Sequence, residues 1–273
     1  GVQTGSTSGQ PGSATSVRVR GIASVSGGVS PVYVIDGVRI SSGDLTRQNT
    51  TANILSNLNN NDIESVTVLK DAVSTALYGA DSGAGVIIIT TKSGKSGKAK
   101  FSFSNSYGVS SRAVDGPKAA TRDQLLDLAA ESLINYTPFV NAGYYSTKAE
   151  AYDAIVNPGY DLLGWANYVG NDTNWQKEVE RKSPYQNEIN FSVNGGSDKM
   201  KYYSSIGYFK QEGIVKNSDF GKVNGALKLD YKATDRLSIS TDFQFSNSKM
   251  KSLPNGGNYA NPMLAQYFIT PLD

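Results

Sequence analysis

The sequence predicts a small mixed α/β domain followed by antiparallel strands of the kind that build a transmembrane β-barrel. Two observations predict this architecture. Residues 62–92 have the pattern of a strand, a short helix, a glycine-rich turn and a buried strand. Beyond residue 99, apolar and polar residues alternate over runs of about 9–12 residues, the length that a tilted membrane strand requires.

The composition narrows the range of functions. The chain has 273 residues, a formal net charge of +2, no histidine and no cysteine. Imidazole bases, thiol nucleophiles, disulfides and the usual zinc sites are therefore excluded, and the charge gives no reason to expect nucleic acid as a partner. No apolar run approaches the ~18 residues of a spanning helix, so a membrane role would use strands or an anchor.

The first elements follow from local patterns. Residues 1–16 are rich in Gly, Ser and Thr and are expected to form a flexible start. Residues 17–21 alternate apolar and basic side chains, so Arg18 and Arg20 share one face of a strand. Asp36 and Gly37 stand between two apolar runs and predict a tight hairpin, because both residues tolerate a positive φ.

The compact unit at residues 62–92 completes this domain. Asp71 is a candidate N-cap for a helix over 72–78, and Gly79 is expected to end it. Glycines such as Gly85 then let the chain turn into the apolar run 86–89. The predicted boundaries are 17–92 for the domain and 93–98 for a linker.

Residues 99–273 are expected to contain the first barrel strands. A soluble β-sandwich also alternates, but its strands average nearer 5–6 residues, which favours the barrel. The phase of the alternation predicts that Lys228 and Asp230 point into the lumen while Leu227 and Leu229 face lipid. The barrel stays incomplete in this chain, so we expect it to be a piece of something longer that aggregates or misfolds when purified alone.

The strand pattern is interrupted at about residues 112–184. A helix is expected over 121–135, with Leu125, Leu128, Ala129 and Leu133 on its apolar stripe. Long and short connections alternate along the chain, which places this segment outside the cell and the short turns at 194–199 and 233–236 in the periplasm. Trp165 and Trp175 lie in this exterior loop and are candidates for facing a substrate.

Catalytic and nucleotide-binding patterns are weak. Residues 93–96 read Ser-Gly-Lys-Ser, but Ile89 stands where a phosphate-binding loop needs glycine. No pair of carboxylates is spaced for acid–base catalysis. The sequence therefore predicts no enzyme activity, no cofactor and no metal site.

Several motifs resemble one family, the SusC/RagA-type TonB-dependent outer-membrane transporters. The resemblance covers nearly the whole chain, with small departures at Arg39, Asn60 and Asp81. The motifs that carry it are Gly9–Gly12, Val17–Gly21, Pro31–Val38, Asp62–Lys92, Asp172–Trp175, Gly195–Gly196 and Gly207–Gly213. It implies that the α/β domain is a plug and that the strands begin a barrel of about 22 strands that closes around it.

The resemblance also assigns roles to residues of the plug. The arginine-glycine motif at Arg20 and Gly21, with Arg18, would pair with barrel carboxylates and hold the plug in place. Glu188 is a partner candidate within this chain, although later strands are better candidates. Asp36 and Gly37 belong to the same motif group, and the plug core motif comprises Glu64, Lys70, Asp71, Tyr78, Gly79 and Gly85.

The implied function is energy-coupled import of a large nutrient, a glycan or an oligopeptide, across the outer membrane of a Gram-negative cell, gated by the plug. The implied partners are a SusD-like surface lipoprotein, TonB through a segment absent from this chain, outer-membrane lipid and the remainder of the barrel. Two other hypotheses stay open. One is an outer-membrane adhesin that binds a surface ligand through its loops. The other is a soluble carbohydrate-active enzyme on a sandwich fold.

Overall fold

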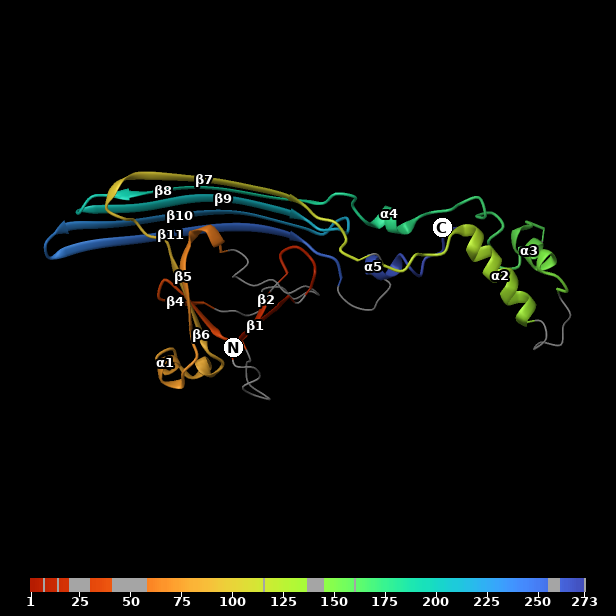
Figure 1. Cartoon of the computed structure of the whole chain (residues 1–273), viewed down its shortest axis with the longest axis horizontal. Helices are drawn as coiled ribbons and strands as arrows, with labels where there is room; N and C mark the ends of the chain where they lie inside the picture. Colours follow the sequence, from red (N-terminus) through yellow and green to blue (C-terminus); the bar gives the residue numbers. More distant parts are fainter. Residues whose placement is uncertain are drawn as a thin grey trace. The chain divides into compact units, whose positions relative to one another are not determined.

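A computed structural model gives the architecture of the chain (Figure 1). It describes residues 1–6, 8–13, 15–19, 30–40, 58–114, 116–136, 145–159, 161–254 and 261–272. The chain divides into two compact units. The first joins residues 1–111 to 183–256, and the second joins 112–182 to 257–273.

A four-stranded mixed sheet forms the centre of the N-terminal part. Its strand order is β4-β3-β6-β5, with β3 (Val32–Ile35) parallel to β6 (Val86–Thr91). The outer strands β4 (Val38–Ile40) and β5 (Ile63–Leu69) pair antiparallel with their neighbours. The prediction of a mixed α/β domain is confirmed.

Both faces of this sheet are covered. Val32, Val34 and Val86 form a cluster on one face, with Leu69, Tyr78 and Ile88 packed against them. The alternate residues Tyr33, Ile87 and Ile89 form a second cluster on the other face. A strand buried on both faces needs a continuous apolar sequence, which is why residues 86–89 do not alternate.

The turns of the domain use the residues that the sequence suggested. Asp36 has φ 47° and Gly37 has φ 86°, the two positive angles of a type I′ hairpin between β3 and β4. Asp71 occupies the N-cap position of α1 (Ala72–Ala76). The chain reaches β6 through the short 3₁₀ helix Ala80–Ala84 and Gly85, whose φ is 101°.

The start of the chain differs from the expectation. Instead of a flexible segment at residues 1–16, β1 (Val2–Ser6) pairs antiparallel with β2 (Thr15–Val19). Polar Ser and Thr side chains mask this strand in the composition, but backbone pairing does not depend on apolar side chains. Val17 and Val19 alternate inward, and Val19 is buried.

Five long antiparallel strands form the second sheet, which we call the wall. Its strand order is β11-β10-β9-β8-β7, so strands adjacent in the sequence are adjacent in space (Figure 1). The bounds are β7 (Gly97–Val109), β8 (Tyr185–Gly196), β9 (Met200–Glu212), β10 (Asp219–Thr234) and β11 (Leu237–Lys251). β7 already begins inside the predicted linker 93–98.

The two faces of the wall differ in polarity. Leu227 and Phe243 are cross-strand partners on an exposed apolar face, with Phe243 60% exposed. Lys228 and Asp242 are partners on the opposite face, where Lys228 contacts the N-terminal domain. The predicted phase of Lys228 is confirmed, and the wall is an open sheet with one apolar and one polar face.

β9 explains a stretch whose alternation was unclear in the sequence. Neighbouring aromatic residues in this strand point to opposite faces. Tyr203 is 2% exposed on the polar face, whereas Tyr208 is 41% exposed on the apolar face. Phe209 packs against Phe220 of β10, with ring centroids 6.1 Å apart.

The second unit is helical and has its own core. α2 (Arg122–Tyr136) and α3 (Lys148–Val156) pack together, and both begin with capping boxes, Thr121 with Gln124 and Thr147 with Glu150. The core residues are Leu126, Ala130, Ala151, Ile155 and Leu272. Short helices α4 (Trp175–Val179) and α5 (Pro262–Ala265) complete the unit.

The buried face of α2 is shifted from the expected stripe. Leu126 and Ala130 are buried, with Leu125, Ala129 and Leu133 packed beside them, whereas Leu128 is 59% exposed. Residues 112–182, most of the predicted long exterior loop, form one compact unit with residues 257–273, and the exterior location stays a prediction. In the described ranges, every helix is too short or too polar to cross a membrane.

Candidate functional site

The candidate site is the interface between the N-terminal domain (β1 to β6 with α1) and the polar face of the wall. Both belong to the first compact unit. Their contacts come from the β3–β4 hairpin, the segment 58–62, the segment 93–95 and residues 10–12. These contacts determine how the domain is held on the wall.

Asp36 bonds both its own domain and the wall. Within its own domain, the Thr91 backbone N–H and hydroxyl donate to its two carboxylate oxygens, at 2.8 and 2.6 Å. From the wall, Lys228 Nζ donates to Asp36 Oδ2 at 2.9 Å, and Gln244 Nε2 donates to the same oxygen at 3.3 Å. Asp242 lies on the other side of Lys228, with Oδ2 3.1 Å from Nζ. The hairpin tip is thus tied to β10 and β11.

The surroundings of Asp36 favour its charged form. Burial alone would raise the pKa of this carboxyl group. Hydrogen bonds from Lys228 and Thr91, together with the positive charge of Lys228, outweigh burial and hold the pKa below its ordinary value. Asp36 therefore remains an anion over the physiological pH range.

This shift predicts a loss of attachment in acid. A carboxyl group with a lowered pKa stabilises the folded state above its unfolded pKa, and that contribution is lost as the pH falls through the folded pKa. Since an ordinary Asp has a pKa of about 3.9, we expect attachment of the N-terminal domain to be constant near neutrality and to weaken below about pH 4. Denaturant unfolding of the domain at pH 7 and pH 3 measures this. Asp36→Asn should show a smaller drop, and an equal drop would contradict the assignment to Asp36.

Asp62 makes a second buried contact with the wall. Tyr203 Oη donates to Asp62 Oδ1 at 2.7 Å, and the two residues are 2% and 7% exposed. Asp62 ends the 3₁₀ helix Asn60–Asp62, which Asn59 caps through the Asn61 N–H. A short, rigid turn thus places the carboxylate opposite β9.

The same turn contacts β8 and β10 through amides and a lysine. Asn59 Nδ2 donates to Asn190 Oδ1 at 3.0 Å, and Asn61 Nδ2 donates to Glu188 Oε1 at 2.5 Å. Lys222 Nζ donates to the Leu58 carbonyl at 2.7 Å. Every one of these groups can exchange its partner for water.

Further contacts lie at the start and at the end of the domain. The Gln10 side chain exchanges two hydrogen bonds with the backbone of Leu253, at 2.9 and 2.7 Å. Gly12 has φ 74° and lies so close to the Phe220 ring that a Cβ would overlap it. At the other end, Asn194 bonds the Ser93 carbonyl and the Lys95 N–H.

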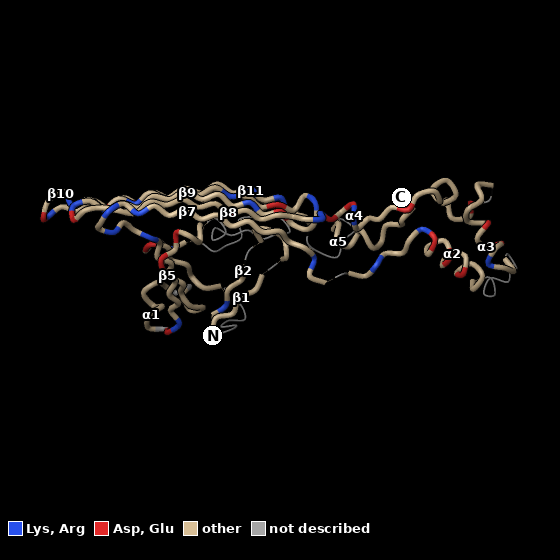
Figure 2. The backbone as a smooth tube through the Cα atoms, turned by 45° about the horizontal axis from the view of Figure 1, so that its top comes forward, with Lys and Arg blue, Asp and Glu red and all other residues tan. Residues whose placement is uncertain are grey.

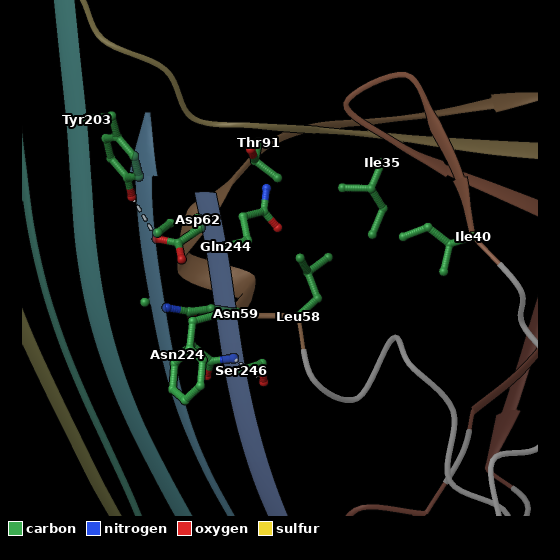
Figure 3. A pocket seen from close by; sticks show the side chains of 13 residues that line it. Ile35, Ile40, Leu58, Asn59, Asp62, Thr91, Tyr203, Asn224, Gln244 and Ser246 are labelled. Atoms are coloured by element: carbon green, nitrogen blue, oxygen red, sulfur yellow. Dashed lines mark hydrogen bonds between the residues drawn. The ribbon is translucent and has the colours of Figure 1, made fainter. Parts of the chain in front are cut away.

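A hollow of about 180 Å³ lies within this interface. Figure 3 shows Asp62 and Tyr203 pointing toward each other, with Asn224 and Ser246 beside them and Ile35 and Ile40 farther away. Its lining combines these polar side chains with the apolar residues Ile35, Ile40 and Leu58. The hydrogen bonds and the ion-pair cluster described above surround this hollow and hold the domain on the wall.

The structure describes only some of the residues that were predicted to hold the plug in place by pairing arginines with carboxylates. Arg18 lies in β2 with an exposed side chain, opposite in phase to the buried Val19. Arg20 and Gly21 lie outside the described residues. Glu188 faces the N-terminal domain as its phase predicted, but the contact described for it there is Asn61. Pairing of the arginines with carboxylates stays a prediction.

The residues of the plug core motif have mostly local roles. Glu64 forms an exposed ion pair with Lys95 at 3.0 Å, and Lys70 is exposed. Tyr78 packs on the Val86 cluster. Gly79 has φ 94°, and at Gly85 a Cβ would come within 3.1 Å of Val19. Glycine is needed at both positions because L side chains rarely adopt these angles.

The two tryptophans serve the packing of the helical unit. Trp165 packs against its core, and the Trp175 Nε1–H donates to the Thr270 carbonyl at 2.8 Å. Both are partly buried. A role in substrate contact stays a prediction for these residues.

Sequence reasoning missed Tyr203, Asn59 and the pairing of Asp36 with Lys228. The phase of β10 indicated that Lys228 points inward, but no local pattern identifies a partner 192 positions away. Among the described residues, no group of three or more His, Cys, Asp or Glu is arranged to hold a metal ion.

Comparisons with known proteins agree with this arrangement. Residues 1–86 match the family model of the TonB-dependent Receptor Plug Domain. The TonB-dependent receptor SusC of Bacteroides thetaiotaomicron is 34% identical over 94% of this chain, and a TonB-dependent receptor of Formosa agariphila is 33% identical over 90%. This chain spans 22% of the length of each.

A solved structure of the RagAB peptide importer in a closed-closed state has the same arrangement. The TM-score is 0.75 at 28% sequence identity, and the match covers 95% of this chain and 29% of that one. The matched proteins carry the names of receptors and importers rather than of enzymes.

Proposed function

Since the chain belongs to the SusC/RagA-type TonB-dependent transporters, as their plug domain and first barrel strands, we propose that the protein it is part of imports a nutrient across the outer membrane of a Gram-negative cell. In this proposal the N-terminal domain is the gate. It fills the barrel at rest and is displaced when TonB pulls on it. No bond of the nutrient is made or broken.

One observation carries the proposal, namely that the contacts between the N-terminal domain and the wall described above are mainly hydrogen bonds and one ion-pair cluster. An intramolecular hydrogen bond contributes only about 0.5–1.5 kcal/mol net, because water replaces the lost partner. An apolar interface of similar size would expose its surface to water at about 25 cal/mol per Å². A polar seat therefore suits a domain that must leave and return.

We propose a large nutrient, a glycan or an oligopeptide, as the substrate. A SusD-like surface lipoprotein would cover the exterior end, and TonB would contact a segment outside this chain. RagAB, a similar structure, is described as a peptide importer, which supports the oligopeptide for that protein and keeps it a candidate here. Arg18 and Arg20 are proposed as further attachment points of the domain, with carboxylates of later strands.

Cross-linking tests whether the gate must move. Asn61→Cys and Glu188→Cys place a cysteine pair where the two native side chains are in contact at 2.5 Å, in a full-length protein from which any cysteine outside this sequence has been replaced. A short, reducible bis-methanethiosulfonate reagent would join them in the full-length protein. We expect nutrient uptake by cells to fall at least roughly tenfold after cross-linking and to return after reduction, because the tether holds the domain in the lumen.

The two single-cysteine variants are the controls and should import normally with reagent. The same cells without TonB should import nothing. The adhesin hypothesis makes the opposite prediction: ligand binding at the cell surface would be unaffected by the cross-link and by loss of TonB. Uptake that continues through a cross-linked protein would refute the gate.

A further inference from the structure

Charged residues on the apolar face of the wall gather at one of its ends. Across β9, β10 and β11, Lys210, Gly221 and Lys249 are aligned in register. One step farther along, Glu212, Asp219 and Lys251 are aligned in the same way. The strands carry their charges largely toward the two ends (Figure 2).

These residues share the outward face with the apolar band. The period of a strand is two, so Lys210 lies on the same face as Tyr208, and Lys249 on the same face as Phe245 and Phe243. Tyr208, Phe243 and Phe245 are 41%, 60% and 51% exposed. The lysines therefore stand at the edge of the band that faces lipid in the proposed function.

The opposite edge of the band lacks such lysines. There the outward positions of β9, β10 and β11 are Met200, Tyr202, Tyr231 and Ile239. The lysine edge is at the end of the wall with the long connections, residues 110–184 and 213–218. In the proposed function this end is exterior, so the lysines lie at the level of the outer-leaflet headgroups.

The aligned residues surround a hollow. It has a volume of about 260 Å³. The six aligned residues line it, together with Tyr208 and Phe220. Gly221 forms its floor between the two lysines, whose backbones are about 9.5 Å apart because two strand spacings separate them. A Lys side chain from each flank can reach an anion placed over Gly221.

Tyrosines mark the same level as a membrane interface. Lys210 Nζ donates to Tyr185 Oη at 2.5 Å and lies 4.9 Å from the centre of that ring. Tyr185 stacks on Tyr107 with centroids 6.0 Å apart. Tyrosines gather where a barrel wall passes from hydrocarbon to headgroups. Glu212 lies farther out, with Oε1 3.6 Å from Lys210 Nζ.

We propose that Lys210 and Lys249, with the hollow over Gly221, bind a phosphate group of a phosphorylated lipid of the outer leaflet, of the lipopolysaccharide type. This rests on the proposed outer-membrane function. The aligned set nearest the apolar band, Lys210, Gly221 and Lys249, has two positive charges and no carboxylate. The carboxylates Glu212 and Asp219 lie one step farther from the band. A lipid whose acyl chains cover Phe243 and Phe245 would place its phosphate beside Lys210 and Lys249.

The test uses the full-length protein in mild detergent, with lipopolysaccharide binding measured by native mass spectrometry. Lys210→Gln with Lys249→Gln removes the two charges, and we expect binding at least roughly tenfold weaker. Lys199→Gln with Lys232→Gln makes the same change in charge at the other end of the wall and should bind normally. Equal affinity in the two double variants would overturn the proposal.

A second pair of variants keeps both lysines. A side chain at Gly221 would meet its nearest atom, the Phe209 carbonyl oxygen, at an ordinary 3.7 Å, so Gly221→Glu and Gly221→Gln should both fold. We expect Glu to weaken lipid binding and Gln to weaken it less, because only Glu repels a phosphate. Equal effects of the two would count against a phosphate site.

Two probes identify the source of the phosphate. Lipopolysaccharide treated with phosphatase should bind weakly to the wild type, and binding as tight as that of the intact lipid would overturn the proposal. Inorganic phosphate at millimolar concentration should not displace the lipid; displacement would indicate a free-anion site instead. Nutrient uptake is measured as well, so a wild-type protein that imports nutrient but binds no lipopolysaccharide refutes this site alone, whereas absence of wild-type protein from the outer membrane refutes the proposed function.

Discussion

Arginine in place of Leu227 is expected to destabilise the folded protein in a bilayer by about 2–4 kcal/mol, the cost of a cation on the lipid face near the middle of a barrel strand. Leu227 lies near the centre of β10 and is 48% exposed on the apolar face. Its cross-strand partner there is Phe243. The lost contact between Leu227 and Phe243 adds to the cost.

The control puts the same charge on the other face. Ser240 of β11 is exposed and pairs across the strands with Asp230, on the face opposite to Leu227. Ser240→Arg should change the free energy of unfolding by less than about 1 kcal/mol, because a lumen position is hydrated. Denaturant unfolding of the full-length protein in lipid vesicles measures both variants. Equal costs would mean that the apolar face of the wall does not contact lipid.

The faces of the wall could be predicted because a strand has a fixed period. Once the run around Lys228 is accepted as a strand, Leu227 and Leu229 must lie on one face and Lys228 on the other. The type I′ hairpin at Asp36 and Gly37 was equally local, since two adjacent residues with positive φ are rarely anything else. Motif resemblance then supplied the identity of the domain.

Other features depend on contacts between distant segments, and no local pattern contains them. β1 was missed because its side chains are mostly small and polar, and only pairing with β2 defines it. On α2, the periodicity was correct but Leu126, not Leu128, is buried, because α3 and Leu272 select the face. The partners of Asp36 and Asp62 follow only from the way the domain sits on the wall.

Lys228→Gln is expected to weaken attachment of the N-terminal domain by about 3 kcal/mol, the low end of the cost of breaking a buried ion pair. Lys228 lies between Asp36 and Asp242, at 2.9 and 3.1 Å, and its side chain is 12% exposed. Without it, the Asp36 and Asp242 carboxylates face each other across the interface, and among the described residues the ion pairs of both are made with Lys228 alone. The lower end is appropriate because Asp242 is 38% exposed and can be hydrated.

Asp36→Asn should cost less than Lys228→Gln, about 1 kcal/mol, since Lys228 keeps Asp242 and the new amide still bonds Thr91. In the double variant the costs should not add, because a single charge contact links the two residues. Hydrogen exchange of the Leu253 amide, which donates to the Gln10 side chain of the N-terminal domain, measures detachment of this domain in the full-length protein.

Lys232→Gln is the matched control, since it removes the same charge from the same strand. Lys232 pairs with Asp235 at 3.3 Å, but their side chains are 51% and 99% exposed. Exposed pairs contribute less than about 1 kcal/mol, so this variant should leave exchange of the Leu253 amide nearly unchanged. If Lys228→Gln had no larger effect than Lys232→Gln, the ion-pair cluster would not hold the domain, and the amide contacts of Asn59 and Asn61 would have to carry the attachment instead.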